Sequence, residues 1–122
     1  MKKYVIMLVM LFTMSVYSFA EDNTATEVER IEKYDIKVNT RKLASFLDLS
    51  EDQMDAVEVI TDEFSKGLMF AATECGKNSR TKVTKNVIDN NLKHMSYVLN
   101  DKQYHKYLAV LNATIINREI EY

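Results

Sequence analysis

The side chains of this 122-residue chain with the most versatile chemistry are one cysteine and two histidines. Cys75 continues an apolar series with helical spacing, which predicts a buried, unreactive thiol. An intermolecular disulfide and a reactive thiol are the alternatives, although the C-terminal end of a helix disfavours a thiolate. His94 and His105 stand eleven positions apart, without partners at the spacing of zinc or di-iron ligands. The sequence therefore predicts no metal site and no cofactor.

Four carboxylates form a second candidate, because steps of 4, 3 and 4 residues place them on one face of a helix. They are Glu51, Asp55, Glu58 and Asp62. Such a stripe can hold a divalent cation, whereas catalytic carboxylates need burial that splits their pKa values. A solvated helix face is the simpler interpretation, and a cation- or ligand-binding module is the alternative. With no Ser–His–acid pattern or glycine-rich phosphate loop, no enzyme is predicted and no catalytic residue is assigned.

Two further clusters are candidates for binding a partner. The first is basic and is expected at the loop between two long helices: Lys77, Arg80, Lys82 and Lys85. The second is aromatic: Tyr97, Tyr104 and Tyr107. Solvated lysines and ordinary aromatic packing are the simpler interpretations, but exposed tyrosines suit a protein-binding surface.

One short phrase occurs twice, fifty positions apart, and predicts how the elements are organised. Its copies are Leu49-Ser50-Glu51-Asp52-Gln53 and Leu99-Asn100-Asp101-Lys102-Gln103. Ser50 and Asn100 are residue types that cap helix N-termini. Gln53 and Gln103 follow three positions later, where a capping box places Glu or Gln. Each phrase is therefore expected to end one helix at its leucine and to start the next.

The periodicity between these phrases predicts an all-α fold of about four helices in two hairpin-like pairs. A short helix should follow Asn39 or Thr40, and a long one should run from Ser50 to a left-handed glycine at Gly76. Its inward face steps by 3, 3, 4, 4, 3 and 4 residues through Met54, Val57, Ile60, Phe64, Leu68, Ala71 and Cys75. Gly67 within it indicates either tolerated weakness or close approach of a neighbouring helix. A polar loop is expected at 77–81.

The third and fourth helices have their own apolar stripes. The third carries Ile88, Leu92, Met95 and Leu99; the fourth carries Tyr104, Leu108, Leu111 and Ile115. Residues 119–122 should fray. On the N-terminal side, a short helix starting at Thr24 or Thr26 is one alternative, but most of 21–33 is expected to be a mobile leader. Alternation over Tyr34–Val38 predicts an extended arm laid on the helical domain of residues 39–122.

Residues 1–20 have the three-part pattern of a cleavable secretory signal peptide, with cleavage expected after Ala20. Its apolar run is shorter than a bilayer span needs, so no stable membrane span is expected after cleavage. The remaining chain carries 14 Lys+Arg and 18 Asp+Glu, a net charge of 14 − 18 = −4, which disfavours a nucleic-acid partner. A periplasmic or secreted location is therefore expected.

The repeated phrase resembles the LTxxQ motif of a family of small helical periplasmic proteins that includes spheroplast protein Y and CpxP. Here the copies read LSEDQ and LNDKQ, with Ser50 and Asn100 where the family usually has threonine. The resemblance implies a dimeric helical cradle that shields unfolded clients, or an envelope-stress accessory protein. The chain differs from the family in two respects: its net charge is acidic, and it has the extended Tyr34–Val38 arm. The leading hypothesis is an exported, chaperone-like interaction protein with a protein partner.

Overall fold

The computed structural model describes residues 12–14 and 25–122, and the side chains from residue 27 onward. Within these residues the chain is all-α, as predicted, with five helices rather than four. The elements are β1 (Phe12–Met14), α2 (Ala25–Tyr34), β2 (Ile36–Val38), α3 (Thr40–Leu47), α4 (Glu51–Glu74), α5 (Lys77–Val98) and α6 (Asp101–Asn117). The predicted signal peptide and its cleavage site lie mostly outside the described residues, and no helix among those described is long and apolar enough to cross a bilayer.

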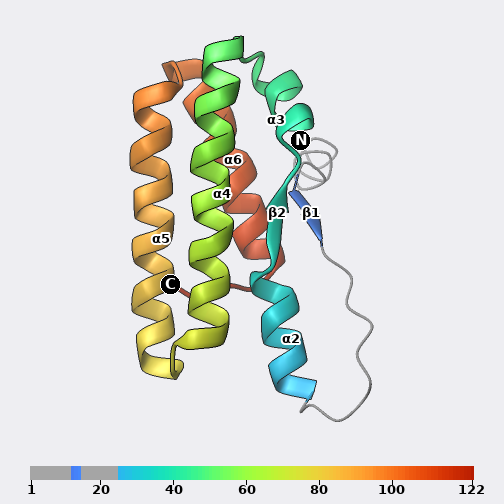
Figure 1. Ribbon diagram of the computed structural model, residues 1–122, viewed down its shortest axis with the longest axis vertical. Coiled ribbons are helices and arrows are strands. Elements are labelled where there is room, and N and C mark those ends of the chain that lie inside the picture. Colours follow the sequence, from blue (N-terminus) through green and yellow to red (C-terminus); the bar gives the residue numbers. More distant parts are fainter. Residues whose placement is uncertain (1–11, 15–24) are drawn as a thin grey trace.

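The three long helices run up and down beside one another, and the segment α2–β2–α3 lies along them (Figure 1). The described core is one apolar cluster drawn from all of these elements, including Ile36, Phe64 and Leu111. Because α3 meets α4 at one end and α2 packs near the other, β2 is held extended along the body. The prediction of an extended arm laid on a helical domain is confirmed for Ile36–Val38.

The helix starts follow the predicted capping residues. Asn39 accepts a hydrogen bond from the backbone N–H of Lys42 at 3.1 Å and begins α3. Ser50 and Asn100 begin α4 and α6, and both helices have complete capping boxes with Gln53 and Gln103. Three residues connect α3 to α4, and two connect α5 to α6, so the chain turns sharply at both motifs.

The predicted inward face of α4 is confirmed from Val57 to Ala71, and the glycine within it has a specific reason. Val57, Phe64 and Leu68 are buried. A Cβ placed on Gly67 would come within 2.8 Å of Val87 Cγ2 on α5. Gly67 therefore permits the close approach of α4 and α5, the second of the two explanations considered.

Two predictions at the α4–α5 turn are wrong. Gly76 is not left-handed but extended, with φ −75°, and it is the N-cap of α5, which begins at Lys77 where a loop was expected. Cys75 lies after the end of α4 as its C-cap and is half-buried, not part of the buried helical face. The turn is stable without a loop because Arg80 Nε and Nη2 donate to the carbonyls of Ala71 and Cys75 at 3.1 and 2.8 Å, which supplies partners to carbonyls that a helix end leaves free.

The predicted disorder at both ends of the helical body is also wrong. Residues 25–34 form α2, because Arg30 Nε donates to Ala72 O at 3.0 Å and Arg118 Nη1 to the carbonyls of Glu32 and Asp35 at 3.0 and 3.1 Å. At the C-terminus α6 ends in a Schellman turn. Ile120 N–H donates to Ile115 O and Glu119 N–H to Ile116 O, which leaves Ile120 buried. Among residues 119–122, Ile120 is buried and the other three are exposed.

Candidate partner-binding groove

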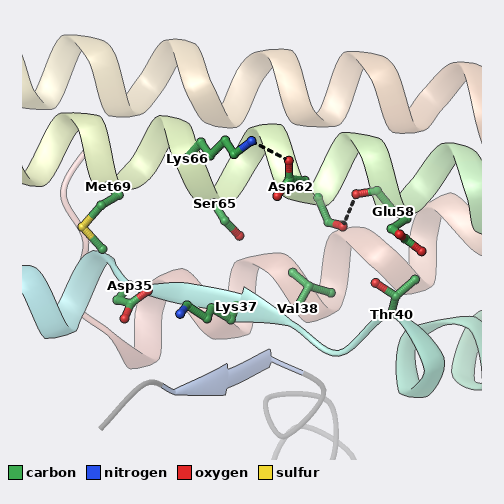
Figure 2. A pocket seen from close by; sticks show the side chains of 10 residues that line it. Asp35, Lys37, Val38, Thr40, Glu58, Asp62, Ser65, Lys66 and Met69 are labelled. Carbon is green, nitrogen blue, oxygen red and sulfur yellow. Dashed lines mark hydrogen bonds and ion pairs between the residues drawn. The ribbon is translucent and has the colours of Figure 1, made fainter. Parts of the chain in front are cut away.

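An open groove of about 520 Å³ runs between β2 and the middle of α4 (Figure 2). The N-terminal segment and the start of α3 contribute Asp35, Lys37, Val38 and Thr40; α4 contributes Glu58, Thr61, Asp62, Ser65, Lys66 and Met69. The groove exists because β2 is a strand packed on a helix, whose side chains meet it only once per turn. Three other hollows on the described surface have smaller volumes, of about 450, 190 and 140 Å³.

One hydrogen bond joins the two walls of the groove, and a second lies within the α4 wall. Ser65 Oγ donates to the carbonyl of Ile36 at 2.6 Å, which holds β2 against α4. Thr61 is buried and donates to the carbonyl of Glu58, one turn earlier in its own helix, at 3.1 Å. These short hydrogen bonds satisfy the polar groups nearest the core.

The rim of the groove carries charges of both signs. Lys66 Nζ lies 3.0 Å from Asp62 Oδ2, and both side chains are largely exposed. Asp35 is buried, and its charge favours the protonated form of Arg118, whose pKa is nevertheless lowered because burial desolvates the guanidinium. Val38 and Met69 add half-buried apolar surface. The arrangement suits an amphipathic polypeptide segment better than a small, strongly charged molecule.

The carboxylate stripe is divided by the structure. Glu58 and Asp62 line the groove, while Glu51 and Asp55 stand exposed nearer the start of α4. In the part of the chain that the structure describes, no three histidine, cysteine or acidic side chains are grouped so that they could hold a metal ion. His94 is exposed on α5, and His105 Nδ1 lies 2.7 Å from the carbonyl of Asp101. Neither histidine lies beside Cys75 in a ligand set.

The tyrosine cluster does not form one surface. Tyr107 is fully buried and its hydroxyl donates to Asn91 Oδ1 at 2.5 Å. Burial raises the pKa of Tyr107 far above its usual value near 10. Tyr104 is half-buried and stacks edge-on against His105. Of the three tyrosines only Tyr97 is strongly exposed, so it is the one that a partner could readily contact.

The basic cluster is divided in the same way. The guanidinium of Arg80 donates to carbonyls at the C-terminal end of α4 and in the turn that follows it. Lys77 and Lys82 are exposed on α5, and Lys77 with Arg80 borders a second hollow beside α2. The structure thus brings none of these residues to the groove between β2 and α4.

The motif residues lie at the end of the bundle where α3 meets α4 and α5 meets α6. Leu99 is buried and Leu49 is half-buried, and Gln53 and Gln103 contact each other across the two turns. They are architectural and do not line the groove. The groove residues were missed as a set, although the sequence did single out Tyr34–Val38 as extended and Glu58–Asp62 as an acidic face.

No family model matches the chain, and neither a curated protein nor a solved structure matches it at a significant level. The class that the structure defines is a small all-α bundle with one strand held along its longest helix.

Proposed function

We propose that the protein is an exported helical interaction protein that binds another polypeptide in a chaperone-like manner, through the groove between β2 and α4. The observation that carries the proposal is the composition of this open groove, where half-buried Val38 and Met69 lie among charges of both signs. Unfolded chains present such mixtures of apolar and charged residues. The signal-peptide pattern of residues 1–20 and the resemblance of LSEDQ and LNDKQ to the LTxxQ motif support export to the periplasm or beyond.

The rest of the surface offers less to a partner. The exposed large apolar side chains are distributed over α4, α5, α6 and the C-terminus, as Val59, Phe70, Tyr97, Ile116 and Tyr122. Contiguous apolar area, rather than single exposed residues, marks an interaction surface. The groove combines shape, apolar contact and charge in one place, and it is therefore the better candidate.

The test is light scattering from a chemically unfolded client diluted into buffer that contains the exported protein. The matched variants are Lys66→Glu and Lys85→Glu. Each removes a lysine from an exposed i,i+4 ion pair of 3.0 Å on a long helix, but only Lys66 lines the groove. Such exposed pairs contribute about 0.3–0.5 kcal/mol, so both variants should fold.

We expect the wild-type protein and Lys85→Glu to suppress scattering near stoichiometric ratios, and Lys66→Glu to require a several-fold higher ratio. Equal activity of the two variants would place client binding elsewhere on the molecule. No suppression with several clients, together with a melting temperature raised by a divalent cation, would instead favour the alternative of a cation-binding module.

A further inference from the structure

Strand β2 has two edges with different neighbours. One edge faces α4, where Ser65 fixes the carbonyl of Ile36. The other edge pairs with β1 in an antiparallel ladder that places Phe12 opposite Val38, Thr13 opposite Lys37 and Met14 opposite Ile36. Figure 2 shows β1 on the side of β2 away from α4, so that β2 lies between β1 and the groove. The structure therefore seats an extended segment on the outer edge of β2.

The occupying segment belongs to the part of the chain that export is expected to remove. Residues 12–14 lie within the predicted signal peptide, and cleavage after Ala20 would take β1 away from β2. The backbone groups of that edge would then lose their partners. An unpaired strand edge is a template for another extended chain, and strand addition is a recurring mode of peptide recognition.

We propose that the outer edge of β2 is a strand-addition site, at which an extended segment of the partner polypeptide takes the antiparallel position that β1 occupies here. The inference rests on the proposed function and adds a second contact to it: backbone hydrogen bonds to the outer edge of β2 hold the segment, on the side of β2 opposite the groove. Such a site accepts many sequences, because main-chain bonds supply affinity and alternate side chains supply preference.

Lys37 determines which segment fits. It is exposed at the centre of the ladder, where the residue opposite it in register is Thr13, an uncharged residue. A second copy of this chain, paired through the same edge with Lys37 at the centre, would bring Lys37 opposite Lys37. Like charges directly opposite each other destabilise a strand pair, and lysine on an edge is a known means of preventing self-association. The favoured occupant is therefore a foreign segment with apolar residues on both sides of a polar or acidic residue.

The experiment uses the exported protein, with its N-terminus determined by mass spectrometry, and a peptide of residues 11–16 with two lysines added at each end for solubility. Binding is measured by titration and by protection of the Ile36–Val38 amides from hydrogen exchange. A scrambled peptide of the same composition is the control. A second series carries an N-methyl group on one backbone amide at a time.

Strand addition predicts that the peptide slows exchange at β2 and that N-methylation weakens binding at least tenfold at alternate positions only, because successive amides of a strand point to opposite sides. Glutamate at the peptide position of Thr13 should bind several-fold more tightly at low salt, and lysine there several-fold more weakly. A uniform effect of N-methylation, or no protection of β2, would overturn the inference. So would an exported protein that retains residues 1–20, or one that dimerises with β2 protected in the absence of peptide.

These outcomes separate the inference from the proposed function. Client protection without alternating N-methyl effects would leave the function standing and remove strand addition. Alternating effects without any client protection would support the strand-addition site and remove the chaperone-like function.

Discussion

The side-chain amides of Gln53 and Gln103, fifty residues apart in the sequence, form a reciprocal pair. Gln53 Nε2 donates to Gln103 Oε1 at 2.8 Å, and Gln103 Nε2 donates to Gln53 Oε1 at 3.2 Å. Each Oε1 also accepts its own N-cap N–H at 3.0 Å. Gln53 Nε2 also donates to the carbonyl of Val98. Gln103 Nε2 also donates to the carbonyls of Leu47 and Asp48. The two capping boxes are thus one network that joins both helical turns.

The first prediction concerns the coupling within this network. Gln103 is buried, so Gln103→Ala should cost about 1–3 kcal/mol because carbonyls and an amide lose their partners. Gln53→Ala should cost less, because Gln53 is only half-buried. The double variant should be less destabilised than the sum of the two by about 0.5–3 kcal/mol, the range for contacting residues. Urea unfolding of the four proteins measures this difference, and strict additivity would show that the glutamines act only as separate caps.

Local chemistry explains why the starts of α3, α4 and α6 could be predicted. The side chains of Asn39, Ser50 and Asn100 each accept a hydrogen bond from the backbone N–H three residues later, so the nearby sequence is enough to predict their role. The pairing of Gln53 with Gln103 was not predicted, because a capping box specifies its own helix and nothing about another. The same limit applies to Arg118, which meets carbonyls 83–86 positions away.

The candidate groove was predictable only in part for the same reason. Alternation identified Ile36 and Val38 as extended, and helical spacing identified Glu58 and Asp62 as one face. That these two patterns border one hollow depends on the packing of β2 against α4, which no local periodicity specifies. Tyr107, one of the candidates for a partner-binding surface, lies in the core, in agreement with the simpler interpretation of aromatic packing, and its hydroxyl donates to Asn91 there.

The second prediction is that Gly67→Ala destabilises the protein. In an exposed helix this change would stabilise by about 1 kcal/mol. Here the new Cβ would meet both methyl groups of Val87, at 2.8 and 3.0 Å, and a β-branched side chain cannot easily turn aside. Overpacking typically costs about 1–3 kcal/mol. Thermal unfolding should show a lower midpoint.

The matched control is the same substitution beside a smaller neighbour. In a Val87→Ala background, Gly67→Ala should be neutral or stabilising, because the contact is removed. A loss of equal size in both backgrounds would mean that helix approach at Val87 is not the reason for the glycine.

The third prediction concerns the buried hydrogen bond of Tyr107. Tyr107→Phe should cost about 1–3 kcal/mol, since Asn91 Oδ1 would lose its donor inside the core. Asn91 Nδ2 already has no hydrogen-bond partner among the described residues, so the site has little capacity to rearrange. Tyr97→Phe is the control, because Tyr97 is 74% exposed and should change stability little.

The raised pKa of Tyr107 also predicts a dependence on pH. Above about pH 10 the unfolded tyrosine releases its proton while the native one keeps it, so stability from this group is complete below pH 10 and falls as pH rises. The slope is about 1.4 kcal/mol per pH unit for one such group. Urea unfolding between pH 8 and 11.5 measures the free energy of unfolding at each pH. Its decrease with pH should be absent in Tyr107→Phe and present in Tyr97→Phe. The same slope in both variants would contradict the assignment.

The fourth prediction uses the left-handed residue that ends α6. Glu119 has φ 56°, a conformation that is unfavourable for a residue with a Cβ, and it occupies the position of the Schellman turn where glycine is preferred. Glu119→Gly should therefore stabilise the protein by about 0.5–1 kcal/mol, after the greater flexibility of glycine in the unfolded chain is counted. Glu121→Gly removes the same charge two residues later, where no positive φ occurs, and should give no gain. Equal midpoints for the two variants in thermal unfolding would show that the turn at Glu119 does not limit the stability of the C-terminus, and that Ile120 reaches the core at no conformational cost.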